Sequence, residues 1–307
     1  QEDSILSHLG DLIDIVLEPE RRDTFPAIAL ASSYVFFEKN MDRDEAIVVL
    51  PVDPYAEIEY FETIKSLQEL VESDKAKIGL MGIKPTYPSA KYGYILTENG
   101  TGAVKGFQEK PSEALAEELI ADGAMWNGGV FAFKAGYIMD ILASYISFES
   151  FEDVREQYSV LPKISFDYEV IENEKSISMV EYTGIWKDLG TWNTLTEVMD
   201  SHTVGNVVMS DSCNNSHVIN ELDIPVTVLG AKDMVIAASP DGILISDKHE
   251  SSYLKEYVDG LSKRPMYEES GWGEAKVLDY NDNEDGTSTL TKSIFIKAGE
   301  CLQYQQH

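Results

Sequence analysis

Several short motifs place carboxylate, amide and ammonium groups at the ends of expected strands. Residues 106–111 read GFQEKP, so Glu109 and Lys110 stand side by side where an apolar strand stops at Pro111. In a regular strand, neighbouring side chains point to opposite faces. The two groups are therefore either solvated charges or a pair that the ending strand releases toward one ligand. In the second case Glu109 would accept from hydroxyl groups and Lys110 would donate to a phosphate.

Two aspartates favour metal-assisted chemistry on phosphates. Asp53 ends the apolar run 45–53, and open α/β sheets bind ligands beyond the carboxyl ends of such strands. It could equally cap the following helix. Asp188 lies between two tryptophans, before a glycine turn and a new helix. Carboxylates that converge at one sheet edge suit Mg²⁺, which takes one or two carboxylates and fills its shell with water and phosphate oxygens.

Glycine-containing motifs add candidate sugar contacts. Asn127 precedes a glycine pair before an apolar strand, and its amide can both donate to and accept from hydroxyl groups. A β-bulge at the strand entry is the alternative. Gly93 stands between two tyrosines, where it predicts either a bulge or a floor for a ring-shaped ligand.

One acidic motif, FDYEVIE over residues 166–172, is harder to interpret. Its three acids recur at helical spacing, and they are Asp167, Glu169 and Glu172. On one face of a helix Asp167 and Glu172 would lie near each other. Most such acids are solvated, so the pattern favours a solvated face over a site.

The elements that must position these groups alternate between strand and helix to about residue 200. Apolar runs predict strands at 12–17, 45–53 and 76–83, and helical spacing predicts helices from Pro26 onward and over 58–71. Residues 92–111 predict a hairpin that turns at ENGTG. This order is typical of an α/β domain with a mostly parallel sheet, in which 45–53 is a central strand buried on both faces.

After about residue 203 the pattern changes to short β-rich steps separated by polar turns. Such steps predict strands stacked in a small solenoid-like or sandwich-like unit. The segment 251–261 is compatible with a helix. The last stretch, 289–307, predicts two strands around a turn at Gly299.

Composition limits the classes of function. With 24 Lys plus Arg against 54 Asp plus Glu, the net charge is 24 − 54 = −30, which repels nucleic acid and anionic membranes. Two cysteines without ligand spacing fit a reducing compartment. We expect neither a membrane span nor a signal peptide. Neither end resembles a natural terminus, so we expect a segment to be missing on each side.

Seven motifs, together and in this order, closely resemble the mannose-1-phosphate guanylyltransferases, also called GDP-mannose pyrophosphorylases. They are EPERRDTFPAIAL, VVLPVD, YGYI, FQEKP, WNGGVFAF, LPKISFDYEVIE and WKDLGTWNTL. The resemblance covers almost all of residues 10–220. The tail from RPMYEESGWG onward is similar to the entry of the cupin-like domain that many members carry.

The resemblance implies a fold and a reaction. We expect a Rossmann-like, GT-A-like nucleotidyltransferase domain with a mixed sheet over 1–202. A short left-handed β-helix-like unit would follow over 203–258, and the start of a cupin-like β domain over 259–307. The implied reaction transfers a guanylyl group from GTP to α-D-mannose 1-phosphate and gives GDP-mannose and pyrophosphate. It would supply a nucleotide sugar for polysaccharide biosynthesis in the cytoplasm.

The resemblance also implies residue roles. Asp53 and Asp188 match the positions that hold the metal, here Mg²⁺, and Lys110 matches the basic group on the sugar phosphate. The positions expected to bind mannose 1-phosphate are Gly93, Glu109, Lys110, Asn127 and Glu172. The positions expected to bind the nucleotide, near its guanine base, are Glu18, Arg21 and Thr24.

The chain departs from the family pattern in three places. The glycine-rich, basic N-terminal loop that cradles the triphosphate is absent, so we expect the chain as written to bind GTP poorly. Pro54 replaces the usual histidine, whose role cannot be carried over. The tail stops at His307, before the histidine cluster of an isomerase site.

Two rival functions stay open. They are a non-catalytic sugar-nucleotide-binding or regulatory homologue, and a bifunctional enzyme with phosphomannose isomerase activity beyond His307. Physics alone does not decide the base, the sugar epimer or the oligomeric state, for which a homodimer is one option.

Overall fold

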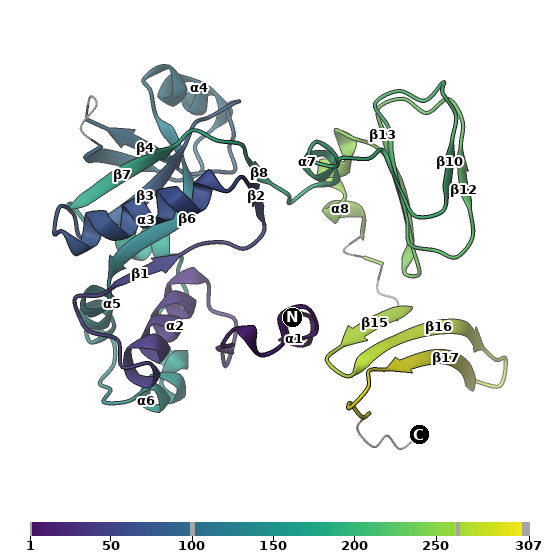
Figure 1. Ribbon diagram of the computed structural model, residues 1–307, viewed down its shortest axis with the longest axis horizontal. Coiled ribbons are helices and arrows are strands. Elements are labelled where there is room, and N and C mark those ends of the chain that lie inside the picture. Colours follow the sequence, from purple (N-terminus) through teal and green to yellow (C-terminus); the bar gives the residue numbers. More distant parts are fainter. Residues whose placement is uncertain (1, 99–101, 259, 262–264, 303–307) are drawn as a thin grey trace. The chain divides into compact units, whose positions relative to one another are not determined.

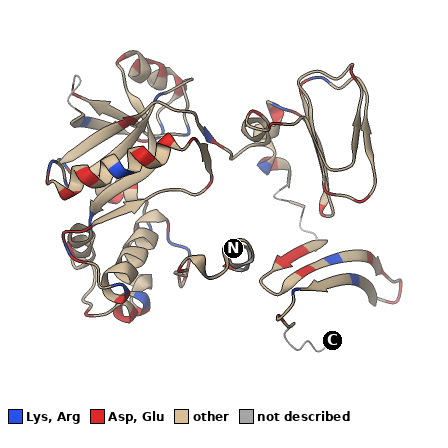
Figure 2. Cartoon of the chain, viewed as in Figure 1, with Lys and Arg blue, Asp and Glu red and all other residues tan. Residues whose placement is uncertain are grey.

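The computed structural model describes residues 2–98, 102–258, 260–261 and 265–302 (Figure 1). The chain divides into two compact units. The first unit is Val16–Lys187, and the second combines Gln1–Ile15 with Asp188–His307. Within the described residues, none of the helices has the length and hydropathy that a membrane span requires. Acidic side chains occur throughout both units (Figure 2).

The first unit is built on a mixed sheet. In spatial order its strands are β5 (Val104–Gln108), β4 (Tyr94–Thr97), β6 (Met125–Lys134), β3 (Ile78–Ile83) and β7 (Ile177–Tyr182), and β1 (Ala46–Val49) also pairs with β6. β3 is parallel to β7 and antiparallel to β6, whereas β4 and β1 are antiparallel to β6 near its two ends. A separate ribbon joins β2 (Pro54–Ala56) to β8 (Trp186–Asp188).

Two strand predictions for the N-terminal part of the chain are wrong. The run 45–53 is not a central parallel strand, because β1 pairs antiparallel with β6 and its four residues are only half-buried. An apolar run records burial but not the direction of the neighbouring strand, so it could not distinguish the two cases. Residues 12–17 form no strand: a 3₁₀ turn ends at Leu12, whose side chain is 85 % exposed.

Helices cover both faces of the sheet. They are α2 (Thr24–Glu38), α3 (Glu59–Glu72), α4 (Glu113–Ala121), α5 (Ala135–Leu142) and α6 (Phe151–Glu156), with short turns η2 (Tyr158–Val160) and η3 (Asp167–Ile171). One core cluster joins α2 and α5 to Ile78 and Phe133 of the sheet. A second joins α3 to Met81 and Val130. Alternate residues of the buried strands therefore pack into two different cores. The predicted helices from Pro26 and over 58–71 are confirmed.

The predicted hairpin is also confirmed. β4 and β5 pair antiparallel, with Tyr94 opposite Gln108 and Thr97 opposite Val104. Three residues of its expected turn, 99–101, lie outside the described residues.

The second unit contains stacked parallel strands, as the short β-rich steps predicted. They are β9 (Thr203–Val204), β10 (Val207–Met209), β11 (His217–Asn220), β12 (Val226–Val228) and β13 (Met234–Ser239), followed by the antiparallel β14 (Gly242–Asp247). β10 lies parallel to β12, and β11 lies parallel to β9 and β13. This pairing is that of a short solenoid, in which Thr203 lies opposite Val218, His217 opposite Val235 and Val207 opposite Val226.

The remaining elements of this unit come before or after the solenoid strands along the chain. They are α1 (Glu2–Leu9), η1 (Gly10–Leu12), α7 (Trp192–Thr196), η4 (Glu250–Tyr253), α8 (Lys255–Val258), β15 (Tyr267–Ser270), β16 (Gly273–Asp282) and β17 (Ser288–Ile296). The helix-compatible segment 251–261 contains η4 and α8. Of the two strands expected around Gly299, β17 forms, and residues 303–307 lie outside the described residues. The expected boundaries at 202 and 258 stay predictions.

Candidate active site

The GFQEKP motif brings its two charges together. β5 ends at Gln108, and Lys110 then adopts a left-handed backbone with φ of 43°, which costs a non-glycine residue roughly 1 kcal/mol. This change of direction cancels the strand alternation, and Lys110 Nζ lies 3.1 Å from Glu109 Oε1. The Glu109 side chain is only 10 % exposed, whereas that of Lys110 is 61 % exposed. The ending strand therefore brings the two charged groups into contact with each other, and the expectation that both reach one ligand stays a prediction.

Gly93 provides the space that the Glu109 carboxylate occupies. A Cβ atom at position 93 would lie 2.4 Å from Glu109 Oε2 and 2.8 Å from the ring of Phe107. Both distances are shorter than carbon atoms tolerate, so any side chain here would displace the carboxylate. The carbonyl oxygen of Gly93 accepts a hydrogen bond from the backbone N–H of Asn127 at 2.8 Å. The YGYI, FQEKP and WNGG motifs thus meet at one point.

Asn127 is held from both ends of its amide. Its Nδ2 donates to Asp167 Oδ1 at 2.8 Å, and its Oδ1 accepts from the backbone N–H of Gly129 at 3.1 Å. The register between β3 and β6 shifts between Leu80 and Gly82, and Gly82 is the partner of Asn127. The bulge that we considered as an alternative is therefore present, and it accompanies the placement of the amide.

Asp167 completes this cluster, although the residue roles implied by the resemblance did not include it. It begins η3, a single π-helical turn. Burial, and next the nearby Glu109 carboxylate, raise the pKa of Asp167 to about 6, while the Asn127 hydrogen bond and Lys110 act in the opposite direction. The hydrogen bond to Glu109 raises the pKa of Lys110. Two carboxylates therefore surround one ammonium group.

Glu172, which we expected at the sugar, is not part of this cluster, and its role stays a prediction. It is exposed and lines a cavity of about 630 Å³ that Gln108 and Ile177 also line. A signal for the difference exists in the sequence: Val170 and Ile171, three and four residues after Asp167, are buried. Those two residues share a helical face with Asp167, so the inward-facing acid is Asp167 and not Glu172.

Aromatic rings pack beside the residues of this cluster. Tyr92 lies 4.9 Å from Trp126 and 5.7 Å from Trp186 between ring centroids. Tyr92 precedes Gly93 and Trp126 precedes Asn127 along the chain, so ring packing fixes the two strand segments that carry these residues. Among the described residues, the buried indole nitrogens of Trp126 and Trp186 have no hydrogen-bond partner.

The two aspartates expected at the metal belong to different units, and their joint site stays a prediction. Asp53 is exposed just after β1. Asp188 Oδ1 accepts from the backbone N–H of Gly190 at 2.9 Å. No group of three or more His, Cys, Asp or Glu residues forms a metal-binding cluster in the described part of the chain. Mg²⁺ does not require such a cluster, because one or two carboxylates suffice.

The segments next to these aspartates are tied together within the first unit. The hydroxyl of Tyr182 donates to the carbonyl of Ile185 at 3.1 Å and accepts from the backbone N–H of Glu57 at 3.3 Å. The Glu57 carboxylate in turn accepts from the Ile185 N–H at 3.0 Å. Glu57 follows β2 and Ile185 precedes β8. Sequence reasoning missed this tie, since its groups are far apart in the chain.

The three predicted nucleotide residues line one cavity of about 400 Å³. Its lining residues are Glu18, Arg21, Asp23, Thr24, Ala27 and Lys163. Glu18 accepts from the hydroxyl of Tyr158 at 2.6 Å, and Thr24 Oγ1 accepts from the Phe166 N–H at 2.8 Å. The structure thus brings the predicted trio together and adds Lys163, which lies in the LPKISF motif.

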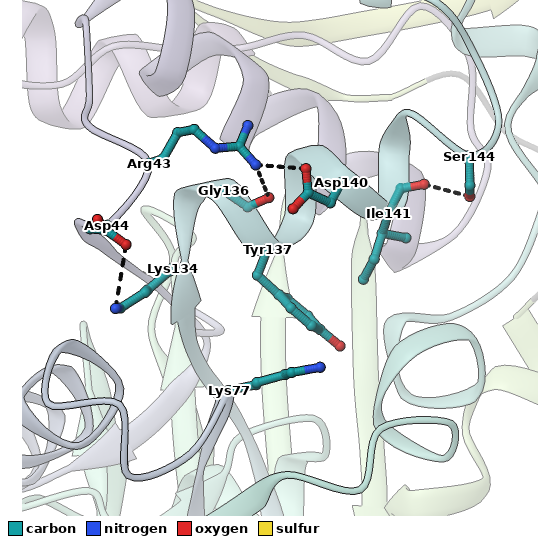
Figure 3. A pocket seen from close by; sticks show the side chains of 9 residues that line it. All are labelled: Arg43, Asp44, Lys77, Lys134, Gly136, Tyr137, Asp140, Ile141 and Ser144. Atoms are coloured by element: carbon teal, nitrogen blue, oxygen red, sulfur yellow. Dashed lines mark hydrogen bonds and ion pairs between the residues drawn. The ribbon is translucent and has the colours of Figure 1, made fainter.

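A larger groove elsewhere in the first unit is an ion-pair network (Figure 3). Arg43 binds Asp140 at 2.6 Å, and Lys134 Nζ lies 3.4 Å from Asp44 and 2.7 Å from Asp74. Acids neutralise its basic groups, and none of the predicted site residues lines it. The candidate site that remains is the cluster of Glu109, Lys110, Asn127 and Asp167.

Comparisons with known proteins identify a family and several similar proteins. Residues 4–204 match the nucleotidyl transferase family. A mannose-1-phosphate guanylyltransferase of Salmonella typhimurium is 31 % identical, with 96 % of this chain and 67 % of that protein aligned. One of Escherichia coli K12 is 29 % identical, with 96 % and 68 % aligned. The crystal structure of a mannose-1-phosphate geranyltransferase from Thermus thermophilus has 30 % identity and a TM-score of 0.67, over 84 % of this chain and 81 % of that chain.

Proposed function

We propose, because this chain belongs to the nucleotidyl transferase family, that the full-length protein transfers a guanylyl group from GTP to α-D-mannose 1-phosphate. The products are GDP-mannose and pyrophosphate. The observation that carries the proposal is the cluster of Glu109, Lys110, Asn127 and Asp167, with Gly93 leaving room for the first carboxylate. The carboxylates and the amide can bind the hydroxyl groups of a sugar 1-phosphate, and the ammonium group beside them can bind its phosphate.

The chemistry of the step suits such a site. A phosphate oxygen of mannose 1-phosphate attacks the α-phosphorus of GTP, and the bond to the pyrophosphate leaving group breaks. The protein performs little covalent work, so positioning and charge neutralisation dominate. Lys110 holds the attacking phosphate against the repulsion of the triphosphate, and its raised pKa keeps it an ammonium at neutral pH.

We assign the divalent metal of this family to Asp53 and Asp188, with Mg²⁺ as the ion. Carboxylate oxygens are the ligands that Mg²⁺ prefers, and its remaining positions suit phosphate oxygens. When bound, Mg²⁺ neutralises and orients reacting phosphates. The tie between Glu57, Tyr182 and Ile185 supports the assignment, because it fixes the segments beside both aspartates.

At the nucleotide end we assign the cavity lined by Glu18, Arg21 and Thr24 to the guanine nucleotide. In this cavity the carboxylate of Glu18 can accept hydrogen bonds from a purine edge, the guanidinium of Arg21 can donate to it, and the hydroxyl of Thr24 can do either. The names of the relatives support guanine as the base.

Pyrophosphate release by the full-length protein tests the function. We expect release with GTP, α-mannose 1-phosphate and Mg²⁺, and much less with other nucleotide and sugar 1-phosphate pairs in a panel. A protein that binds GDP-mannose but releases no pyrophosphate would instead be the non-catalytic homologue.

The role of Lys110 has a matched control in a lysine just before the motif. Lys110→Ala should raise the KM for mannose 1-phosphate by about tenfold or more, because a charge-assisted hydrogen bond is lost, and should affect the KM for GTP much less. Lys105→Ala removes an exposed lysine of β5, the strand that precedes Lys110, and should change neither. If Lys110→Ala raises the KM for both substrates equally, Lys110 does not have the assigned role.

A further inference from the structure

In the part of the chain that the structure describes, the Asn127 amide has one side-chain anchor, Asp167. Its Oδ1 takes one hydrogen bond from the Gly129 backbone, and one hydrogen of Nδ2 goes to Asp167 Oδ1. An amide offers two N–H donors and two acceptor lone pairs. Within the described residues, one donor and one lone pair thus stay available, in an orientation that both anchors determine.

We propose that Asp167 is a positioning residue for the sugar, which fixes the Asn127 amide so that this donor and this lone pair meet two hydroxyl groups of the sugar 1-phosphate. The inference rests on the proposed function. It gives Asp167 a role through Asn127, without a bond to a reacting atom.

The surroundings of Asp167 support a functional rather than a stabilising role. The charged groups that face it are Glu109, which repels it, and Lys110, which attracts it, while Tyr168 follows on the same turn. Burial and Glu109 dominate and raise its pKa to about 6. A raised carboxyl pKa means that the ionised form destabilises the fold, so a neutral acceptor would serve stability better.

The first experiment measures KM for mannose 1-phosphate and for GTP in the full-length protein. We expect Asp167→Ala to raise the first by about tenfold or more, as for a lost charged hydrogen bond, with GTP changed by less than about twofold. Asp167→Asn should restore most of the affinity, because its amide oxygen still accepts from Asn127. Glu169→Gln, which removes a charge from the same turn, should match wild type.

A double-mutant cycle separates positioning from general structural damage. If Asp167 acts through Asn127, then Asp167→Ala adds almost nothing on an Asn127→Ala background. Additive losses would overturn the proposal, and so would an unchanged KM for mannose 1-phosphate in Asp167→Ala. A loss in Asp167→Asn as large as in Asp167→Ala would also overturn it.

The pH profile provides a readout that a structural role would not move. Ionised Asp167 is the better acceptor, so affinity should fall as pH falls below about 6. The substrate phosphate also titrates near 6. The Asp167→Asn variant should therefore keep only the pH dependence that comes from the substrate phosphate. A wild-type profile identical to that of Asp167→Asn would contradict the inference.

Calorimetric titration with α-mannose 1-phosphate separates this inference from the proposed function. If wild type binds the sugar phosphate without releasing pyrophosphate, the proposed activity is wrong, and the mutant cycle is then read from Kd. If wild type neither binds nor turns over, both proposals are wrong.

Discussion

At the scale of single residues, the candidate site combines groups that are expensive to hold together. Glu109 is nearly buried, and its carboxylate helps to raise the pKa of Asp167 to about 6. Lys110 alone among the residues of the cluster brings a positive charge, and it does so from a left-handed backbone. Such concentrations of charge and backbone strain are typical of functional sites and rare in stabilising ion pairs. Each component therefore makes a separate prediction.

Gly93→Ala tests whether the position of the Glu109 carboxylate matters. A methyl group at position 93 would fall 2.4 Å from Glu109 Oε2 and must displace it. We expect the KM for mannose 1-phosphate to rise by about tenfold or more, with GTP little affected, because one hydroxyl acceptor moves.

Gly106→Ala is the matched control for this variant. It adds the same methyl group to β5, where the nearest atom is Leu96 Cδ1 at an ordinary 3.6 Å. A Gly93→Ala protein with wild-type kinetics would show that Glu109 does not contact the sugar. Thermal unfolding of both variants shows whether any loss reflects the fold.

The sequence predicted most of these residues because the motifs are local. Glu109 and Lys110 are neighbours, and Glu18, Arg21 and Thr24 lie within one turn-rich segment, so proximity in sequence ensured proximity in space. The expected sugar-binding positions included Glu172 and not Asp167, which lies in a π-helical turn, and the role of Glu172 stays a prediction. Side-chain periodicity in such a turn differs from the 3.6-residue repeat. The signal that the sequence does contain is the apolar pair Val170 and Ile171, three and four residues after Asp167.

At the scale of elements, the tie between Glu57 and Ile185 depends on the hydroxyl of Tyr182. This side chain is buried at the end of β7 and bonds both segments. Gly184 makes the geometry feasible, because a Cβ atom there would lie 2.3 Å from the Tyr182 oxygen. The two segments flank the aspartates to which we assign the metal. If the tie holds these segments in place, breaking it should lower the affinity for Mg²⁺.

Tyr182→Phe is expected to raise the Mg²⁺ concentration for half-maximal activity several-fold. It removes one oxygen and leaves the Ile185 carbonyl and the Glu57 N–H without that partner, at a cost of about 1–3 kcal/mol in the free energy of unfolding. Substrate KM values at saturating Mg²⁺ should change little. The measurement is pyrophosphate release across a Mg²⁺ titration, with chemical unfolding in parallel.

Tyr55→Phe is the control, since it removes a hydroxyl from a half-exposed side chain in β2 of the same ribbon. If Tyr182→Phe and Tyr55→Phe show the same Mg²⁺ dependence, the tie does not position the metal ligands.

Element types were more predictable than element partners. Apolar spacing indicated α2, α3, β3 and the β4–β5 hairpin, because each buries a face with its own period. The direction of β1 was not predictable in this way. Its partner β6 begins almost eighty residues later, and strand direction follows from topology, which periodicity does not encode.

At the scale of the whole molecule, the chain carries a net charge of −30, with acidic residues spread over both units (Figure 2). Charge of one sign at this density opposes compaction through self-repulsion. The local ion pairs that counter it, such as Arg43 with Asp140 and Lys134 with Asp74, have exposed carboxylates, so solvent weakens their attraction. Long-range repulsion should therefore outweigh local attraction in the dependence of stability on salt.

Thermal unfolding across a salt series tests this balance. Between about 10 mM and 0.5 M NaCl the Debye length falls from roughly 30 Å to about 4 Å, which screens distant charges more than adjacent ones. We expect the Tm at pH 8 to rise by about 2–6 °C. Choline chloride should give the same rise, since screening needs no specific cation. At pH 5, near the sequence pI of about 4.3, the net charge is smaller and the rise should shrink. A Tm that falls with salt at pH 8 would mean that the paired groups in the Arg43–Lys134 groove, and not the net charge, dominate the electrostatics of the fold.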